Sequence, residues 1–189
     1  MKLSKFAKVF ARELLAQIER AGNYLYEQPR KKRTEKIKNI LRQMARKREF
    51  KFHPYGPRDR SEFLCDFVWM HWFKSHPLWT EYLALAAECE WSTSGRDKTR
   101  PVLYDFRKLL PLRAGLKLLI YQTRPGAPDK TGQKYIDKIC DALEHYKVHA
   151  KGETYFLLEL NREEKRPLLY CWRVNSDRIV ARPLFHSVR

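Results

Sequence analysis

Two apolar stretches determine the predicted fold of this 189-residue chain: Phe-Leu-Cys-Asp-Phe-Val-Trp-Met at residues 63–70 and Leu-Ala-Leu-Ala-Ala-Glu-Cys-Glu at residues 83–90. In the first stretch, apolar side chains recur at every second position, which is the period of a β-strand. The second is a short apolar run of the kind that forms a buried strand. We therefore predict two neighbouring strands, at residues 61–72 and 81–91.

Acidic residues interrupt both stretches. Asp66 lies among large apolar residues, where a charged carboxylate costs several kcal/mol unless it is paired or bound to a cation. Glu88 and Glu90 project from the same strand face about 7 Å apart, because side chains alternate along a strand. If strand pairing brings them beside Asp66, the three carboxylates form a cluster that a hard cation such as Mg²⁺ would neutralise.

Each of these acids also has an ordinary structural explanation. Asp66 could be a satisfied acid at a strand end. Glu88 and Glu90 could pair with Lys or Arg, because the chain has 39 basic and 22 acidic residues. The combination of all three acids in two consecutive strands is much harder to obtain by chance than any one of them.

The hydrophobic pattern outside these stretches predicts an α/β fold. Residues 2–26 form an amphipathic pattern that ends before Pro29, a second helix is expected from an N-cap at Thr34, and a turn is expected at 53–60. Further helices are predicted at 101–112 and 132–148, and further strands at 116–121, 153–160 and 167–174. No linker divides the chain, so we expect one domain, residues 1–189, with a basic helical region at 1–48 and a sheet core with C-terminal strands at 49–189.

Positive charge is concentrated in the N-terminal third. Residues 1–60 hold 18 of the 39 Lys and Arg residues and 6 of the 22 Asp and Glu residues. A solvated helix face is the ordinary explanation for a charged run. Here, however, Glu35 is the one acid among ten bases, and bound phosphates would relieve their mutual repulsion. We therefore predict nucleic-acid contacts from Arg30, Lys31, Lys32, Arg33, Lys36, Lys38, Arg42, Arg46, Lys47 and Arg48.

Other classes of site and location are excluded or disfavoured. The longest uncharged apolar stretch, Tyr82–Ala87, is far shorter than the roughly 20 residues that span a bilayer. Charged residues interrupt any signal-peptide core, so a cytoplasmic location is expected. The four cysteines and six histidines have no spacing typical of a zinc site, so a metal site would have to be built from carboxylates.

At the acidic strands the chain resembles the PD-(D/E)XK nuclease superfamily, which has the restriction-endonuclease-like fold. The resemblance rests on Asp66 in one strand, Glu88-Cys89-Glu90 in the next, a helix carrying residues 104–110 and the strand at 116–121. It covers residues 61–122, and the N-terminal helix also fits. It implies a mixed central β-sheet flanked by helices.

The resemblance also implies residue roles. Asp66 matches the Asp of the signature, Glu88 its Asp/Glu, and Glu90 the position usually held by Lys; some restriction enzymes of the superfamily carry Glu there. Asp66 and Glu88 would hold Mg²⁺ or Mn²⁺, Glu19 in the first helix could add a ligand, and Glu90 would position or deprotonate the attacking water. Lys108 or Lys117 could supply the missing cation.

The implied activity is metal-dependent endonucleolytic hydrolysis of phosphodiester bonds, with DNA as the expected partner and a homodimer or larger complex compatible with it. The alternative is a non-catalytic DNA- or RNA-binding protein on a nuclease-like fold, because fold alone does not fix activity. A basic RNA- or ribosome-associated protein also fits the charge, but it leaves the strand acids unexplained.

Overall fold

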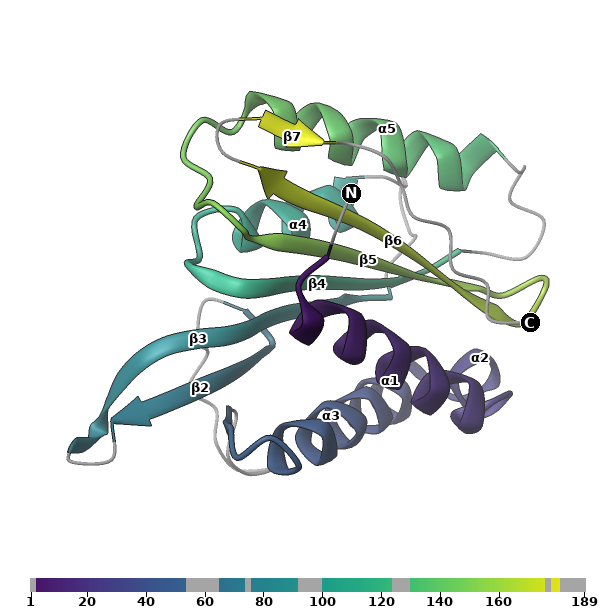
Figure 1. Cartoon of the computed structure of the whole chain (residues 1–189). Coiled ribbons are helices and arrows are strands. Elements are labelled where there is room, and N and C mark those ends of the chain that lie inside the picture. Colours follow the sequence, from purple (N-terminus) through teal and green to yellow (C-terminus); the bar gives the residue numbers. More distant parts are fainter. Residues whose placement is uncertain are drawn as a thin grey trace.

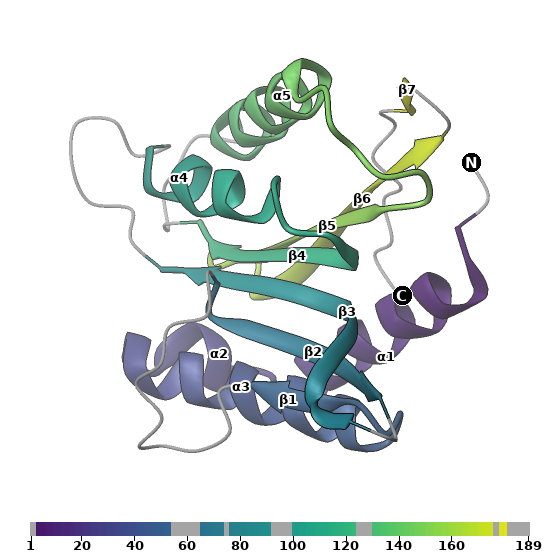
Figure 2. The same ribbon diagram turned by 90° about the vertical axis from the view of Figure 1, so that its left-hand side faces the viewer.

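The structure is a computed structural model that describes residues 3–53, 65–73, 76–91, 100–123, 130–175 and 178–180. Within these residues, seven strands form one mixed sheet with helices on both faces (Figures 1 and 2). The predicted mixed sheet flanked by helices is thus confirmed. The predicted turn after His53 and the first four residues of the predicted strand at 61–72 lie outside the described part of the chain.

The strands lie in the sheet in the order in which they occur in the sequence. Strands β3, β4 and β5 run parallel to one another, and every other neighbouring pair is antiparallel. The carboxyl ends of β3–β5 and the amino end of β2 therefore share one edge, which we call the carboxyl edge. The strands are β1 (Lys51–His53), β2 (Phe67–Phe73), β3 (His76–Glu90), β4 (Ala114–Gln122), β5 (Thr154–Asn161), β6 (Arg166–Asn175) and β7 (Arg178–Val180).

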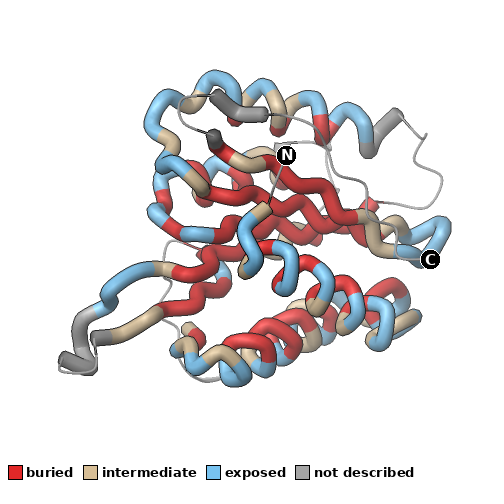
Figure 3. Tube along the Cα trace, in the orientation of Figure 1, coloured by how far each residue is buried: buried red, intermediate tan, exposed pale blue. Residues whose placement is uncertain are grey.

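The helices divide between the two faces of the sheet (Figure 2). Helices α1 (Lys5–Ala21), α2 (Tyr24–Glu27) and α3 (Arg30–Arg46) cover one face, and α4 (Arg100–Leu109) and α5 (Lys130–His145) cover the other. Each layer has its own apolar core, and the strands between them are mostly buried (Figure 3). None of the helices in the described ranges is both long enough and apolar enough to cross a membrane.

The N-terminal region contains two corrections to the predicted helices. The predicted helix at 2–26 is divided, because Gly22 adopts a positive φ of 52° and its N–H caps the end of α1. The second helix begins at Arg30 instead of after Thr34, with Pro29 at its N-cap. Thr34 lies inside this helix, and its hydroxyl donates a hydrogen bond to the Arg30 carbonyl.

The strand that carries the first acid is shorter than predicted. Strand β2 begins at Phe67, and Cys65 and Asp66 form a bend before it. Phe67 pairs with Ala87 of the antiparallel strand β3, one residue before Glu88. Asp66 therefore lies at the carboxyl edge, next to the acidic end of β3.

Candidate active site

The structure brings Asp66 to the segment that carries Glu88 and Glu90. The backbone N–H of Cys89, which lies between these two glutamates, donates a 2.9 Å hydrogen bond to Asp66 Oδ2. Two consecutive strands thus place three acids at the carboxyl edge. This juxtaposition is what strand pairing was expected to produce.

Asp66 itself is not in the environment that we predicted. The sequence indicated a carboxylate buried inside an apolar strand, whereas Asp66 is exposed. The physical reason is that β2 begins at Phe67, one residue after Asp66, so the bend carries Asp66 to the sheet edge. Its carboxylate is therefore accessible to a ligand from solvent.

Glu88 is the buried member of the group, with 1% of its surface exposed. Burial raises the pKa of Glu88 to about 8, and repulsion from Asp66 adds to this effect, while Lys108 opposes it. A carboxylate held in this way has a strong electrostatic reason to bind a cation.

Lys108 of α4 supplies the cation that faces Glu88. Its Nζ lies 2.7 Å from Glu88 Oε1 and 2.8 Å from Asp105 Oδ1, three residues earlier on the same helix. Burial lowers the pKa of Lys108, but its hydrogen bonds to Asp105 and Glu88 outweigh burial and raise this pKa overall. Lys108 therefore remains an ammonium, and of the two replacement cations suggested by the sequence it is the one that lies at Glu88.

Lys117, the second suggested cation, serves a different group of residues. Its side chain is fully buried, and its Nζ contacts Glu153 Oε2 at 3.0 Å and the Tyr155 hydroxyl at 2.8 Å. A third hydrogen bond joins the Leu110 carbonyl. These three contacts use all the donors of the ammonium, so Lys117 has none left for a ligand.

Glu90 ends β3 and is half-buried. Strand alternation places Glu90 on the same face as Glu88, towards α4 and α5. Its register partner on β4 is Tyr121, whose hydroxyl donates a 2.9 Å hydrogen bond to Glu159 on β5. Glu90 thus belongs to the carboxyl edge, next to a second buried carboxylate that the sequence analysis did not single out.

Glu19 is not brought to these acids. It is exposed near the end of α1, on the helical layer that covers the opposite face of the sheet (Figure 2). Its electrostatic influence falls on the Tyr26 hydroxyl, in the same layer. Glu19 therefore lies on the other side of the sheet from the Glu88 carboxylate, which faces α4.

Among the described residues, no group of three or more His, Cys, Asp or Glu side chains is arranged to hold a metal ion. The donor chemistry at Asp66 and Glu88 nevertheless fits Mg²⁺. This ion usually binds one or two carboxylates, keeps several waters and takes further ligands from substrate phosphates. Asp66 offers an exposed carboxylate and Glu88 a desolvated one, so the pair could hold a single ion together with a phosphate.

Asp105, which holds Lys108 against Glu88, was not predicted as a site residue. A signal for it was available, because residues three apart on a helix lie on the same face. Asp105 and Lys108 have this spacing in the helix that follows the acidic strand. The pair could therefore have been predicted once the helix had been assigned.

The ten bases between residues 30 and 48 do not share one solvated face. Arg33 and Lys38 are buried, and Lys47 and Arg48 form ion pairs with Glu13 of α1. The partners of Arg33, Lys47 and Arg48 and the burial of Lys38 are features that the charge count did not indicate. The other six lie on exposed or half-buried positions: Arg30, Lys31, Lys32, Lys36, Arg42 and Arg46.

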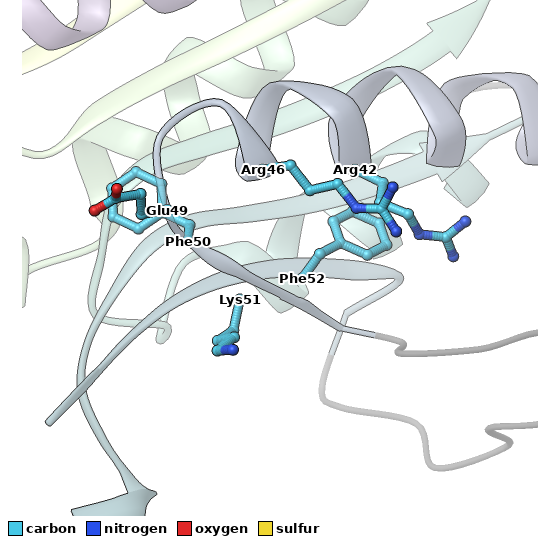
Figure 4. A pocket seen from close by; sticks show the side chains of 6 residues that line it. All are labelled: Arg42, Arg46, Glu49, Phe50, Lys51 and Phe52. Carbon is cyan, nitrogen blue, oxygen red and sulfur yellow. The ribbon is translucent and has the colours of Figure 1, made fainter. Parts of the chain in front are cut away.

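An open pocket of about 390 Å³ lies where α3 meets β1 (Figure 4). It is lined by three bases, one acid and two aromatic rings: Arg42, Arg46, Lys51, Glu49, Phe50 and Phe52. The Arg42 guanidinium lies 5.2 Å from the centre of the Phe52 ring. A cationic hollow with aromatic walls suits contact with a phosphate backbone and its bases.

Comparison with known proteins adds no family assignment, since no protein-family model matches the chain and no curated protein is found to be similar to it.

Proposed function

We propose that this protein is a Mg²⁺- or Mn²⁺-dependent endonuclease with a restriction-endonuclease-like fold, and that its substrate is DNA. The observation that carries the proposal is the meeting of Asp66, Glu88 and Lys108 at the carboxyl edge. Two of these residues come from adjacent strands, and Lys108 comes from the helix that follows. Metal-dependent hydrolysis of a phosphodiester can use both features, a carboxylate pair that binds the metal and a cation beside it.

In this proposal, Asp66 and Glu88 would hold the metal ion, which would lower the pKa of a bound water and offset the charge of the scissile phosphate. Asp105 would keep Lys108 in place if Glu88 bound the metal, because its Oδ1 lies 2.8 Å from the ammonium. Lys108 then donates a hydrogen bond to a phosphate oxygen and stabilises the negative charge that develops there.

Glu90 has the role of positioning the attacking water and accepting its proton. Its position supports this role, because it lies two residues beyond Glu88 on the same strand face. A carboxylate at this point completes the set of metal ligands, cation and base that the reaction needs. Two nearby groups, the Tyr121 hydroxyl and the Glu159 carboxylate, keep this end of the sheet polar.

The exposed bases of α3 supply affinity for the substrate backbone. Their contacts with phosphates position a strand without reading its sequence. The pocket beside Arg42 and Arg46 extends this surface towards β1 (Figure 4). A cytoplasmic location remains a sequence-based prediction.

The deciding experiment is incubation of the purified protein with supercoiled plasmid, single-stranded DNA and RNA, with Mg²⁺, with Mn²⁺ and with EDTA. We expect nicking or linearisation of DNA that requires the metal and that is abolished in Lys108→Met. The matched control is Glu144→Gln, which changes an exposed charge on α5 and should cleave at the wild-type rate. Failure to cleave any of these substrates with either metal would exclude the nuclease activity.

The second candidate is a non-catalytic nucleic-acid-binding protein on the same scaffold. The ion pair between Glu88 and Lys108 favours it, because a lysine that neutralises the buried carboxylate makes a metal ion less necessary. Such a protein should bind DNA equally well with Mg²⁺ and with EDTA. A nuclease should consume DNA with Mg²⁺ and only bind it with EDTA.

A further inference from the structure

Arg33 is a buried cation that has no acidic partner among the described residues. It lies in the first turns of α3, and 6% of its surface is exposed. Its guanidinium donates a hydrogen bond to the side-chain carbonyl of Gln122 and lies 4.7 Å from the centre of the Trp91 ring. No carboxylate within the described ranges forms an ion pair with it. Burying a cation that only an amide and an aromatic ring balance costs folding free energy. A bound anion would offset this cost.

The donors around Arg33 are not fully used. Its Nε and the side-chain nitrogen of Gln122 are both buried, and neither has a hydrogen-bond partner among the described residues. Burial lowers the pKa of Arg33, and repulsion from Arg162 and then Arg30 lowers it further. Both of these other arginines are exposed. Arg30 and Arg162 thus lie close enough to Arg33 to repel it, and Arg33 and Gln122 each keep one unpartnered buried donor.

The amino end of α3 adds a further attraction for anions. Helix α3 has 17 residues, and Pro29 at its N-cap makes no side-chain hydrogen bond to the first turn. The first backbone N–H groups of a helix lack partners within the helix, and the helix dipole places partial positive charge there. Together with Arg30 and Arg33, the free N–H groups add positive potential at this end of α3.

The Arg33 cluster lies at the same carboxyl edge as the candidate active site. Trp91, which lies under Arg33, follows Glu90 directly in the sequence. Gln122 follows Tyr121, which is the register partner of Glu90 on β4. Trp91 and Gln122, which contact Arg33, are therefore each one residue beyond the Glu90–Tyr121 pair of β3 and β4. The Arg33 side chain lies on the α3 side of the sheet.

We propose that Arg33, Arg30 and Arg162, with the side-chain amide of Gln122, bind one backbone phosphate of the nucleic-acid strand, close to the phosphate that is cleaved. That this phosphate belongs to a nucleic acid rests on the proposed function. Forked guanidinium donors match the paired oxygens of a phosphodiester, and the amide adds a donor at their side. A phosphate held here would fix the register of the strand across the carboxyl edge.

Thermal unfolding with inorganic phosphate tests the anion site without any nucleic acid. At equal ionic strength, we expect phosphate in place of chloride to raise the Tm of the wild type by about 3 °C, because a ligand that binds only the folded state stabilises it. Arg33→Met should lose this response, yet be at least as stable as the wild type in chloride, since it removes an unpaired buried cation. The control Arg12→Met, on an exposed position of α1, should keep the response.

Gln122→Glu provides a second variant that keeps Arg33. It places a carboxylate against the guanidinium, so an internal anion takes the place of the phosphate. We expect this variant to be stabilised in chloride and to respond little to phosphate. Equal phosphate responses in the wild type, Arg33→Met and Gln122→Glu would overturn the proposal.

Binding of DNA in EDTA tests whether the anion is a backbone phosphate. In a series of single-stranded oligonucleotides, each with one uncharged methylphosphonate linkage, we expect one position to reduce wild-type affinity at least fivefold. Arg33→Met should lose the sensitivity at that position and keep it elsewhere. If the two proteins share one profile while DNA is still bound and cleaved, the phosphate subsite is wrong and the nuclease proposal survives. A phosphate response without DNA binding would overturn both.

Discussion

Two lysine–glutamate groups lie on the face of the sheet that α4 and α5 cover, and they differ in how completely they are satisfied. Lys117 and Glu153 form a closed group, in which the ammonium makes three hydrogen bonds and both side chains are buried. The Tyr155 hydroxyl also donates to Glu153 and contacts His149. The Lys117 ammonium faces one carboxylate, with the Tyr155 hydroxyl and the His149 ring beside them.

Lys108 and Glu88 form an open group. The Lys108 ammonium faces two carboxylates, Glu88 and Asp105, and the exposed Asp66 repels Glu88 from the other side. The exposed fraction of the Lys108 side chain is 36%. This group holds more acidic side chains than its one lysine can balance, and it is accessible from solvent.

The difference separates a structural ion pair from a candidate functional one. A closed pair gains little from a ligand, because every donor and acceptor already has a partner. The open group has one more acid than its cation can balance, which is the condition for binding a metal ion. The number of carboxylates around each lysine, and not burial alone, therefore distinguishes the two.

The largest expected effect concerns Asp66→Asn. Removing a charged ligand from a site with few others should abolish Mg²⁺ binding and lower the cleavage rate by about 10⁴-fold, since metal assistance contributes several kcal/mol. Calorimetric titration with Mg²⁺ and plasmid nicking measure the two effects. Normal cleavage by Asp66→Asn would remove Asp66 from the site.

The next effect compares the two lysines directly. Lys117→Met leaves Glu153 buried without its cation, so we expect a loss of about 4 kcal/mol in the free energy of unfolding at pH 7. Lys108→Met should lose less than about 1.5 kcal/mol, because Glu88 can remain protonated when its pKa is raised. Urea unfolding in EDTA measures both values. Equal losses would contradict the distinction between a closed and an open group.

Two substitutions test the role of Glu90 in the open group. Glu90 is the site residue that departs most from the family resemblance, because this position is usually held by Lys. Glu90→Gln should keep the fold and Mg²⁺ affinity but lower cleavage by about 10²- to 10³-fold, since an amide cannot accept the proton from water. Glu90→Lys restores the commoner family pattern, but it brings a positive charge beside the metal ion and Lys108, so we expect it to impair cleavage as well. An inactive wild type that gains activity in Glu90→Lys would identify the chain as a binding protein on an inactivated nuclease fold.

The raised pKa of Glu88 predicts how stability depends on pH. In the unfolded chain this carboxyl releases its proton near its ordinary pKa of 4.5, whereas the folded protein keeps the proton up to about pH 8. The folded state therefore binds more protons between these values, and stability falls as pH rises through them. We expect Glu88 to account for a loss of about 2 kcal/mol between pH 6 and pH 8 in EDTA.

The variant Glu88→Gln should flatten this part of the stability curve, whereas the exposed control Glu144→Gln should leave it unchanged. A smaller slope of the same sign should persist, because burial also raises the pKa of Glu159. Unfolding free energies at several pH values give the comparison. A Glu88→Gln curve as steep as that of the wild type would contradict the raised pKa.

The sequence predicted the elements of the fold better than their ends. Periodicity identified the acidic strands and both helices on the α4 face, because long apolar patterns reflect burial. It did not show the break at Gly22 or the start of β2 at Phe67, since single backbone turns leave little trace in a pattern. Because the start of β2 was placed too early, Asp66 was predicted in an apolar interior, whereas it lies at an exposed edge of the sheet.

The site was predictable to a similar extent. Strand order and alternation were enough to place Asp66, Glu88 and Glu90 at the same edge of the sheet, because these are consequences of sheet geometry. Residue type alone could not distinguish Lys108 from Lys117, since the choice depends on which side chains α4 and β5 bring to each ammonium. The buried state of Arg33 within a basic run was equally invisible to a charge count.

The smallest effect concerns the exposed bases of α3, which should bind phosphates without sequence preference. Charge reversal at Lys36, Arg42 and Arg46 should weaken DNA binding in EDTA and flatten its dependence on salt. Each lost phosphate contact lowers the slope of log affinity against log salt by about 0.9, so three contacts lower it by about 2.7.

Reversal of Lys8, Arg12 and Arg20 on α1 changes the total charge equally and controls for it. Fluorescence anisotropy over a range of salt concentrations measures the slopes. If both triple variants flatten the slope to the same degree, α3 contributes only to the overall charge, and the phosphate contacts must be sought elsewhere on the protein.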